Sequence, residues 1–377
     1  MCIGMSRKKN LKVLMVTDAY YPYPSGVSEY VHCLSNILRN LGHTVDIVAT
    51  SFGRKEDSKY DAIRIGKVLY VPLNKSYATV PVGFDVPAKM KYLMQSSRYD
   101  VIHLNGPIFP NLSYFALKYS STRTISTFHT SSEKVSGFGG NLFKKIFGDM
   151  NAKIDVRIAV SKQAQRTNEM YIPGKYHIVP LGIDVRRFAP RGDKCAEIGR
   201  NSILFVGRMD PRKGLHRLLR AFTVVKREMP DALLFIVGSG PARAKYERMA
   251  VDYGVGDSVI FKGVVAISQL PEYFRSATVY TSPAEGGESF GLVLIEAMAS
   301  GVPVVASSIA GYDEVIENGR NGILLDTDDP AAYAESLLNV LQSAKLRRTL
   351  IAEGLKDVTT KYSWDIIGRR IERFYYE

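Results

Sequence analysis

The sequence is poor in cysteine: Cys2, Cys33 and Cys195 are its three, and they lie far apart. An odd and scattered set argues against a disulfide framework and against a cysteine-based metal site, and it favours a reducing compartment. No apolar run is long enough to span a bilayer. Residues 1–10 are basic but are not followed by the apolar core of a signal peptide. We therefore expect a cytoplasmic protein.

Two further absences concern ligands. The dinucleotide motif G-x-G-x-x-G does not occur in the first strand–loop–helix unit, which argues against a dinucleotide-dependent oxidoreductase. No nucleic-acid-binding motif is present, and the basic residues are spread along the chain rather than gathered in one tract. Basic residues are nevertheless in excess and give a net charge of +13. We interpret this charge as favouring a membrane surface or an anionic substrate, and we expect no nucleic-acid partner.

The pattern that is present is an alternation of short apolar strands with amphipathic helices, and it begins twice. A chain of 377 residues is long enough for two domains. The first unit reads as a strand at 11–17, a helix at 27–41 and a strand at 44–49, which is a Rossmann-like opening. The second begins with a strand at 202–206 and a helix at 215–227. Between them, residues 185–200 are rich in Arg, Pro and Gly, as a linker would be.

The region between these units is less regular. We predict short strands at 62–65 and 68–71, then a loop, then a helix at 86–95; the loop contains Lys75, Tyr77, Pro81 and Phe84. Further strands are expected at 100–104, 124–128 and 156–161, and a helix is expected after a cap at Ser161. Residues 141–150 form a basic amphipathic stretch, either a membrane-surface helix or an ordinary domain helix.

The most informative stretch is residues 282–301, which read as the end of a strand, a glycine loop, a helix and a turn. The helix begins near Phe290 or Gly291, and its free N–H groups and positive dipole end form a natural anion site. It is apolar nearly all round, so it should be buried. Glu296 lies inside the apolar run and Glu288 in the loop at its mouth. A buried carboxylate needs a partner, and either sugar hydroxyls or a lysine would serve.

Glu288 and Glu296, with seven residues between them, match the E-x7-E element of retaining glycosyltransferases of family 4, which have the GT-B fold. The surrounding segments make the resemblance specific: they read Glu-Ser-Phe-Gly and Glu-Ala-Met-Ala-Ser-Gly-Val-Pro-Val-Val-Ala. Within that family the block most resembles the phosphatidylinositol mannosyltransferases. The resemblance implies an α/β protein with two Rossmann-like domains facing a cleft and a C-terminal helix crossing back. We accordingly predict an acceptor domain at 1–184 that includes helix 362–377, and a donor domain at 185–361.

The resemblance also assigns roles. Arg208 and Lys213 would hold the leaving diphosphate, with help from the backbone N–H groups of residues 289–292. Glu296 would bind the ribose hydroxyls and Glu288 the sugar ring, while His129 would contact the sugar from the other domain. We take His129, Glu288, Arg208 and Lys213 as catalytic. The predicted donor-binding residues are Gly26, Arg208, Lys213, Val264, Glu288, Ser289, Phe290, Gly291, Leu292 and Glu296.

The resemblance implies transfer with retention of configuration, by a route in which the leaving phosphate deprotonates the acceptor. No metal-ligand cluster is visible, so we expect no metal site and no required cofactor, although Mg²⁺ can assist a diphosphate. Residues 263–269, in the loop expected at the nucleobase, include no acidic residue that would bind guanine. GDP-mannose is favoured by resemblance and a UDP-hexose stays open.

The expected acceptor is an anionic lipid such as phosphatidylinositol, with the enzyme peripheral on the inner face of the membrane. The alternatives are a soluble sugar or phosphosugar acceptor, and a sugar-nucleotide epimerase or hydrolase on the same fold. His103, also at a strand end, is interpreted as structural. The sequence determines neither the linkage nor the oligomeric state.

Overall fold

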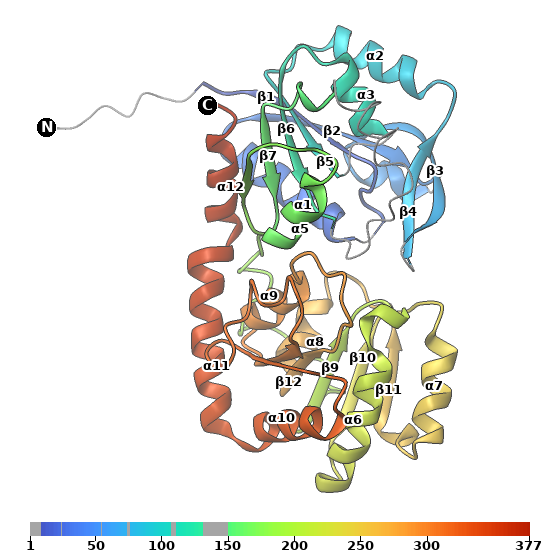
Figure 1. The fold of residues 1–377 in the computed structure, drawn as a ribbon, viewed down its shortest axis with the longest axis vertical. Helices are drawn as coiled ribbons and strands as arrows, with labels where there is room; N and C mark the ends of the chain where they lie inside the picture. Colours follow the sequence, from blue (N-terminus) through green and yellow to red (C-terminus); the bar gives the residue numbers. More distant parts are fainter. Residues whose placement is uncertain (1–8, 24, 54, 74–75, 107–110, 131–149) are drawn as a thin grey trace, which may run out of the picture.

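The computed structural model describes residues 9–23, 25–53, 55–73, 76–106, 111–130 and 150–377. These residues form two α/β lobes, one above the other in Figure 1, with the last helices running along one side of both. Each lobe has a sheet with helices packed on it. This confirms the expected α/β class with two Rossmann-like units.

The first lobe contains, in the described part of the chain, an eight-stranded sheet in the order β4-β3-β2-β1-β5-β6-β7-β8. Every neighbouring pair is parallel except β3 and β4. The strands are β1 (Lys12–Thr17), β2 (Thr44–Ser51), β3 (Ile63–Leu73), β4 (Ser76–Val82), β5 (Val101–Asn105), β6 (Arg123–Phe128), β7 (Val156–Ala159) and β8 (Tyr176–Ile178). The helices are α1 (Gly26–Asn40), α2 (Val86–Ser96), α3 (Leu112–Tyr119) and α5 (Lys162–Glu169), with a 3-10 turn at Lys55–Lys59.

Local sequence explains where these helices begin. The Ser25 side chain accepts a hydrogen bond from the backbone N–H of Ser28 at 3.0 Å and caps α1. In the same way the Ser161 side chain accepts from the backbone N–H of Ala164 at 2.9 Å and caps α5, as predicted. Gly42 follows α1 with a φ of +97°, a conformation that glycine adopts without strain.

Two predictions for the first lobe were wrong. The two short strands expected at 62–65 and 68–71 are one long strand, β3, and part of the expected loop is its antiparallel partner β4. Pro81 suggested a loop, but β4 lies at the edge of the sheet, where a missing backbone donor is tolerated. Helix α3 was not predicted, because only a short stretch carries its pattern. Most of the basic stretch 141–150 lies outside the described residues.

The second lobe contains, among the residues described, a six-stranded parallel sheet in the order β11-β10-β9-β12-β13-β14. Its strands are β9 (Ser202–Val206), β10 (Leu233–Val237), β11 (Val259–Gly263), β12 (Val279–Ser282), β13 (Val304–Ser307) and β14 (Ile323–Leu325). Its helices are α6 (Leu215–Glu228), α7 (Arg243–Asp252), α8 (Leu270–Ser276), α9 (Leu292–Ala299), α10 (Pro330–Gln342) and α11 (Ala344–Asp357), with 3-10 turns at Pro211–Lys213 and Gly256–Ser258. The strand predicted at 202–206 is confirmed.

The end of the chain returns to the first lobe. After α11, a π-helical turn at Val358–Tyr362 leads into α12 (Trp364–Arg373), which packs against α1. The backbone N–H of Ile183 donates to the Tyr362 carbonyl at 2.8 Å, so the two connections between the lobes are bonded to each other. Beyond α12, the Tyr375 hydroxyl lies 2.7 Å from His103 Nδ1 inside the first lobe. The predicted crossing of the C-terminal helix is therefore confirmed, and the domain boundary at 184/185 stays a prediction.

Candidate active site

Two cations in the loop between β9 and α6 pair with the carboxylate of Glu288, which lies in the glycine loop before α9. Lys213 Nζ lies 2.8 Å and Arg212 Nη1 lies 3.1 Å from Glu288 Oε1. The Glu288 side chain is only 11% exposed, so its charge needs this compensation. Of the two partners that the sequence allowed, sugar hydroxyls or a lysine, the structure supplies the lysine and adds an arginine.

The same loop also places Arg208 and Asp210. Arg208 Nε lies 3.8 Å from Asp210 Oδ2, and the arginine side chain is 43% exposed. The Asp210 carboxylate is buried, and neither of its oxygens has a hydrogen-bond partner in the described part of the chain. Arg208 and Lys213 are thus both brought to the loop at the carboxyl end of β9, where they can bind an anion.

The glycine loop before α9 is held by close packing. Gly291 caps the helix with a φ of +88°, and a Cβ there would lie 2.8 Å from the Tyr312 ring. A Cβ at Gly214 would overlap the carbonyl oxygen of Pro283, so the two loops touch through backbone. These contacts leave little freedom to the loop that carries Glu288.

The predicted donor-binding residues at the start of α9 differ in what they can offer a donor. Helix α9 begins at Leu292, and the residues just before it, Ser289 and Gly291, follow Glu288 in the same loop. Phe290 is different, because its side chain is buried against the Tyr362 ring, with ring centroids 5.7 Å apart. Therefore only the backbone of Phe290, and not its side chain, is placed to contact a nucleotide-sugar donor.

Glu296 is buried within α9, as its apolar surroundings predicted. Burial raises its pKa from 4.5 to about 8, and the neighbouring charge of Glu29 adds to the rise, while Arg187 opposes it. Glu29 lies in the first turn of α1, and its Oε1 is 2.7 Å from Arg187 Nη1. The site therefore has a second charged cluster, in which the linker residue Arg187 pairs with Glu29 and also acts to lower the pKa of Glu296.

Arg187 also reaches the loop expected at the nucleobase. Its Nη2 donates to the Ile267 carbonyl at 2.8 Å, just beyond β11. Val264 in the same loop is 75% exposed and makes no contribution to the core. Arg187 thus connects the start of α1 to the loop after β11.

His129 follows β6 at the carboxyl edge of the first sheet, where it was predicted. Its Nε2 is buried without a hydrogen-bond partner among the described residues, and burial lowers its pKa to about 3. Its ring meets the Tyr30 ring edge-on at 4.6 Å. His103 differs, because both of its ring nitrogens have partners, Tyr375 on one side and Thr127 at 2.7 Å on the other. A structural role for His103 agrees with these bonds, whereas His129 Nε2 has no such partner among the described residues.

Gly26 begins α1, and a Cβ built there meets no atom within 4 Å, so the space beside it is open.

Sequence reasoning missed three residues of this site: Arg212, Glu29 and Arg187. Arg212 stands directly before Lys213, so the adjacent cations were a signal, whereas the pairing of Glu29 with Arg187 depends on residues 158 positions apart.

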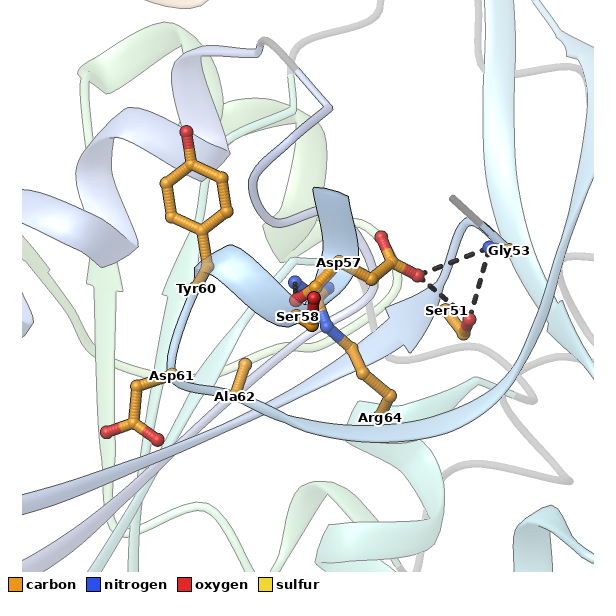
Figure 2. Close-up of a pocket in the computed structure, with 8 residues that line it drawn as sticks. All are labelled: Ser51, Gly53, Asp57, Ser58, Tyr60, Asp61, Ala62 and Arg64. Atoms are coloured by element: carbon orange, nitrogen blue, oxygen red, sulfur yellow. Dashed lines mark hydrogen bonds between the residues drawn. The ribbon is translucent and has the colours of Figure 1, made fainter. Parts of the chain in front are cut away.

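A surface hollow of about 790 Å³ lies at the carboxyl end of β2, in the first lobe. Figure 2 shows Asp57 turned toward Ser51 and Gly53; its Oδ2 accepts from Ser51 Oγ at 2.9 Å and from the Gly53 backbone N–H at 3.2 Å. Asp57 therefore closes the β2–β3 loop. In the part of the chain that is described, no group of three His, Cys, Asp or Glu residues could hold a metal ion.

The fold and the site define a class: a two-lobed α/β enzyme with cations and carboxylates at the carboxyl edges of its parallel strands. Two family models match, "Glycosyltransferase Family 4" over residues 24–187 and "Glycosyl transferases group 1" over residues 194–357. The chain is 34% identical to the phosphatidyl-myo-inositol mannosyltransferase of Mycobacterium tuberculosis, over 97% of this chain and 96% of that protein. The chain belongs to family 4 of the glycosyltransferases, and it is a transferase.

The chain is also similar to a second glycosyltransferase over part of its length and to a solved structure over nearly all of it. The D-inositol 3-phosphate glycosyltransferase of Corynebacterium kroppenstedtii is 33% identical over 58% of this chain and 52% of that protein. A crystal structure of Anabaena Alr3699/HepE in complex with UDP and glucose superposes with a TM-score of 0.76 at 16% identity, covering 97% of this chain and all of that one. The structural likeness supports the GT-B fold. Among the described residues, no helix is long and apolar enough to cross a membrane.

Proposed function

We propose that the chain is a retaining hexosyltransferase that moves a sugar from a nucleotide-sugar donor to a lipid acceptor such as phosphatidylinositol. The similarity to phosphatidyl-myo-inositol mannosyltransferase over nearly the whole of both chains carries this proposal. GDP-mannose is the favoured donor, and a UDP-hexose is the alternative, because the loop after β11 has no acidic residue for guanine. The division into an acceptor domain at 1–184 and a donor domain at 185–361 belongs to the same proposal.

In the donor site, Arg208 and Lys213 stabilise the negative charge that develops on the departing diphosphate. Their position at the carboxyl end of β9 supports this role, together with the exposure of the Arg208 guanidinium. The helix start at Leu292 adds backbone N–H groups and the positive end of the helix dipole. Such fixed donors need no rearrangement as charge develops.

The sugar and the ribose are bound by Glu288, Glu296 and His129. Glu288 binds sugar-ring hydroxyls and stabilises positive charge at the anomeric carbon, and Glu296 hydrogen-bonds to the ribose. His129 reaches the sugar from the first lobe through Nε2, which has no hydrogen-bond partner in the part of the chain that the structure describes. The leaving phosphate accepts the proton of the acceptor hydroxyl, and the new bond forms on the face that the phosphate leaves. Mg²⁺ can assist the diphosphate, but no step requires it.

Exposed apolar side chains support a membrane surface on the first lobe. Phe84 is fully exposed between β4 and α2, Tyr92 on α2 is 72% exposed and Leu69 on β3 is 51% exposed. Exposed lysines accompany them, including Lys89 and Lys91 on α2. Aromatic side chains with nearby lysines are typical of segments that lie on anionic bilayers. We therefore place the enzyme on the inner face of the membrane as a peripheral protein.

A soluble acceptor is the second candidate. The similarity to a D-inositol 3-phosphate glycosyltransferase favours it, although that similarity covers only part of either chain. The two candidates share the donor site and the mechanism. They differ in whether the acceptor carries acyl chains.

The donor is tested first, by thermal-shift measurements with GDP, UDP, ADP and their sugars. Binding to the folded state raises the unfolding temperature by mass action. We expect GDP and GDP-mannose to stabilise the wild type and not Arg208→Ala. Arg227→Ala is the control, because it removes an exposed arginine whose one ion-pair partner among the described residues is Glu228. No stabilisation by any nucleotide would overturn the donor site.

The acceptor is tested by transfer of labelled sugar to phosphatidylinositol in vesicles, compared with soluble inositol 3-phosphate. Label in the lipid fraction supports the proposal, and label only in the soluble product selects the second candidate. Membrane binding is tested by sedimentation with anionic vesicles. Phe84→Ser should weaken it, whereas Val251→Ser on α7, which removes a side chain that is 70% exposed in the second lobe, should not.

A further inference from the structure

The two cations at Glu288 bind the same oxygen. Lys213 Nζ and Arg212 Nη1 both lie within hydrogen-bond distance of Oε1, and the structure records no bond to Oε2 among the described residues. One oxygen of the carboxylate is therefore fully engaged while the other is available. The second oxygen, Oε2, is thus able to accept a hydrogen bond from a ligand.

Arg212 is fixed where it lies. Its Nη1 also donates to the Gly287 carbonyl at 2.5 Å, and its own carbonyl accepts from the Glu285 backbone N–H at 2.8 Å. A Cβ at Gly287 would lie 3.1 Å from Arg212 Cδ, so the arginine stem lies flat against a residue with no side chain. Arg212 thus ties the loop after β9 to the loop before α9 through its bonds to Glu285, Gly287 and Glu288.

Lys213 is placed differently. Among the described residues its side chain donates one hydrogen bond, to Glu288, whereas an ammonium has three donors. Under the proposed function, this ammonium is required by the departing diphosphate, which competes with Glu288 for it. If Lys213 turned to the phosphate and nothing replaced it, the buried Glu288 carboxylate would lose its compensation.

We propose that Arg212 is a positioning residue for Glu288. It keeps Oε1 of the carboxylate paired while Lys213 binds the diphosphate, so that Oε2 stays directed at the sugar throughout the reaction. Arg212 itself touches neither the phosphate nor the sugar. The role rests on the proposed function, because it presumes a diphosphate that engages Lys213.

The test separates binding from turnover. Arg212→Met, Arg212→Lys and Lys213→Met are compared with the wild type for binding of GDP and UDP alone, and for kcat and KM with GDP-mannose or UDP-glucose and phosphatidylinositol vesicles. Arg217→Met is the matched control, since it breaks an arginine–carboxylate pair of 2.7 Å with Asp328 outside the site.

We expect Arg212→Met to lower kcat by on the order of 10- to 100-fold, the usual effect of losing a group that orients a functional side chain. Its dissociation constant for the nucleoside diphosphate should stay within about threefold of wild type, because the phosphate ligands are intact. Arg212→Lys should restore most of kcat. Lys213→Met should weaken both binding and turnover, and Arg217→Met neither.

Two results would overturn the role of Arg212: an unchanged kcat in Arg212→Met, or a loss of diphosphate binding as large as in Lys213→Met, which would make Arg212 a phosphate ligand. If Arg212→Met does not fold, Arg212→Gln, which keeps amide donors without the charge, takes its place in both assays. A wild type that binds neither GDP nor UDP would instead overturn the proposed function, and the role of Arg212 with it.

Discussion

Replacing Glu296 by glutamine should remove a pH-dependent loss of stability. Burial raises the pKa of this carboxyl from 4.5 to about 8, so between these values the folded chain holds a proton that the unfolded chain has released. Unfolding then releases a proton, and raising the pH favours it. The stabilisation of the folded chain by the proton on Glu296 is fully present below about pH 4.5 and is lost as the pH rises through about 8.

The magnitude follows from the size of this window. Each pH unit within it changes the unfolding free energy by about 1.4 kcal/mol, so the whole window is worth at most about 5 kcal/mol. Glu296→Gln cannot ionise and keeps nearly the same shape. Relative to wild type, the variant should therefore gain stability steadily between pH 5 and pH 8, with a slope that approaches 1.4 kcal/mol per pH unit.

The assay is urea unfolding of both proteins at pH 5, 6, 7 and 8, followed by the fluorescence of Trp364, the one tryptophan of the chain. Trp364 is 5% exposed at the connection between the lobes, so it reports loss of tertiary structure. Other titrating groups contribute equally to both proteins and cancel in the difference. A difference that stays constant from pH 5 to 8 would refute the reasoning, and so would a variant that loses stability relative to wild type as the pH rises.

Three further substitutions test the packing around the site. Gly214→Ala should lower the unfolding free energy by at least about 3 kcal/mol, because a Cβ would overlap a backbone carbonyl at a φ of +68°; urea unfolding measures this. Glu314→Gln should cost about 1 kcal/mol and make the chain more sensitive to limited proteolysis between the lobes, since its carboxylate accepts the Lys162 backbone N–H at 2.8 Å at the start of α5. Tyr375→Phe should also cost about 1 kcal/mol in the same assay, because it removes the hydroxyl bonded to His103; a variant as stable as wild type would show that this bond contributes nothing.

The sequence was most informative where structure is local. The strand at β9 was predicted with the same bounds that the structure shows, because four apolar residues, 203–206, lie between polar residues and a glycine turn. The cap of α5 at Ser161 could be predicted because a serine before a helix bonds only three residues ahead. The burial of α9 could be predicted because its residues are apolar on nearly every face.

Pairing between distant segments was harder to predict. β4 was taken for a loop because its hydrogen bonds go to β3, and its proline is tolerated only because the strand lies at an edge. Arg212 was missed because its partner Glu288 lies 76 positions away. The predictions for the individual site residues stay predictions until the experiments above are done.

The fold class and the family could be predicted from the sequence, because they depend on periodicity and on short motifs such as the spacing of Glu288 and Glu296, which the covalent chain sets. The folded structure was needed to show which cations compensate Glu288, which carboxylate influences Glu296, and which of two histidines has a ring nitrogen without a partner among the described residues. Those outcomes depend on distances between side chains from different strands and lobes. Since the energy of a buried charge depends on its closest partners, the same carboxylates could have had other electrostatic roles in another packing.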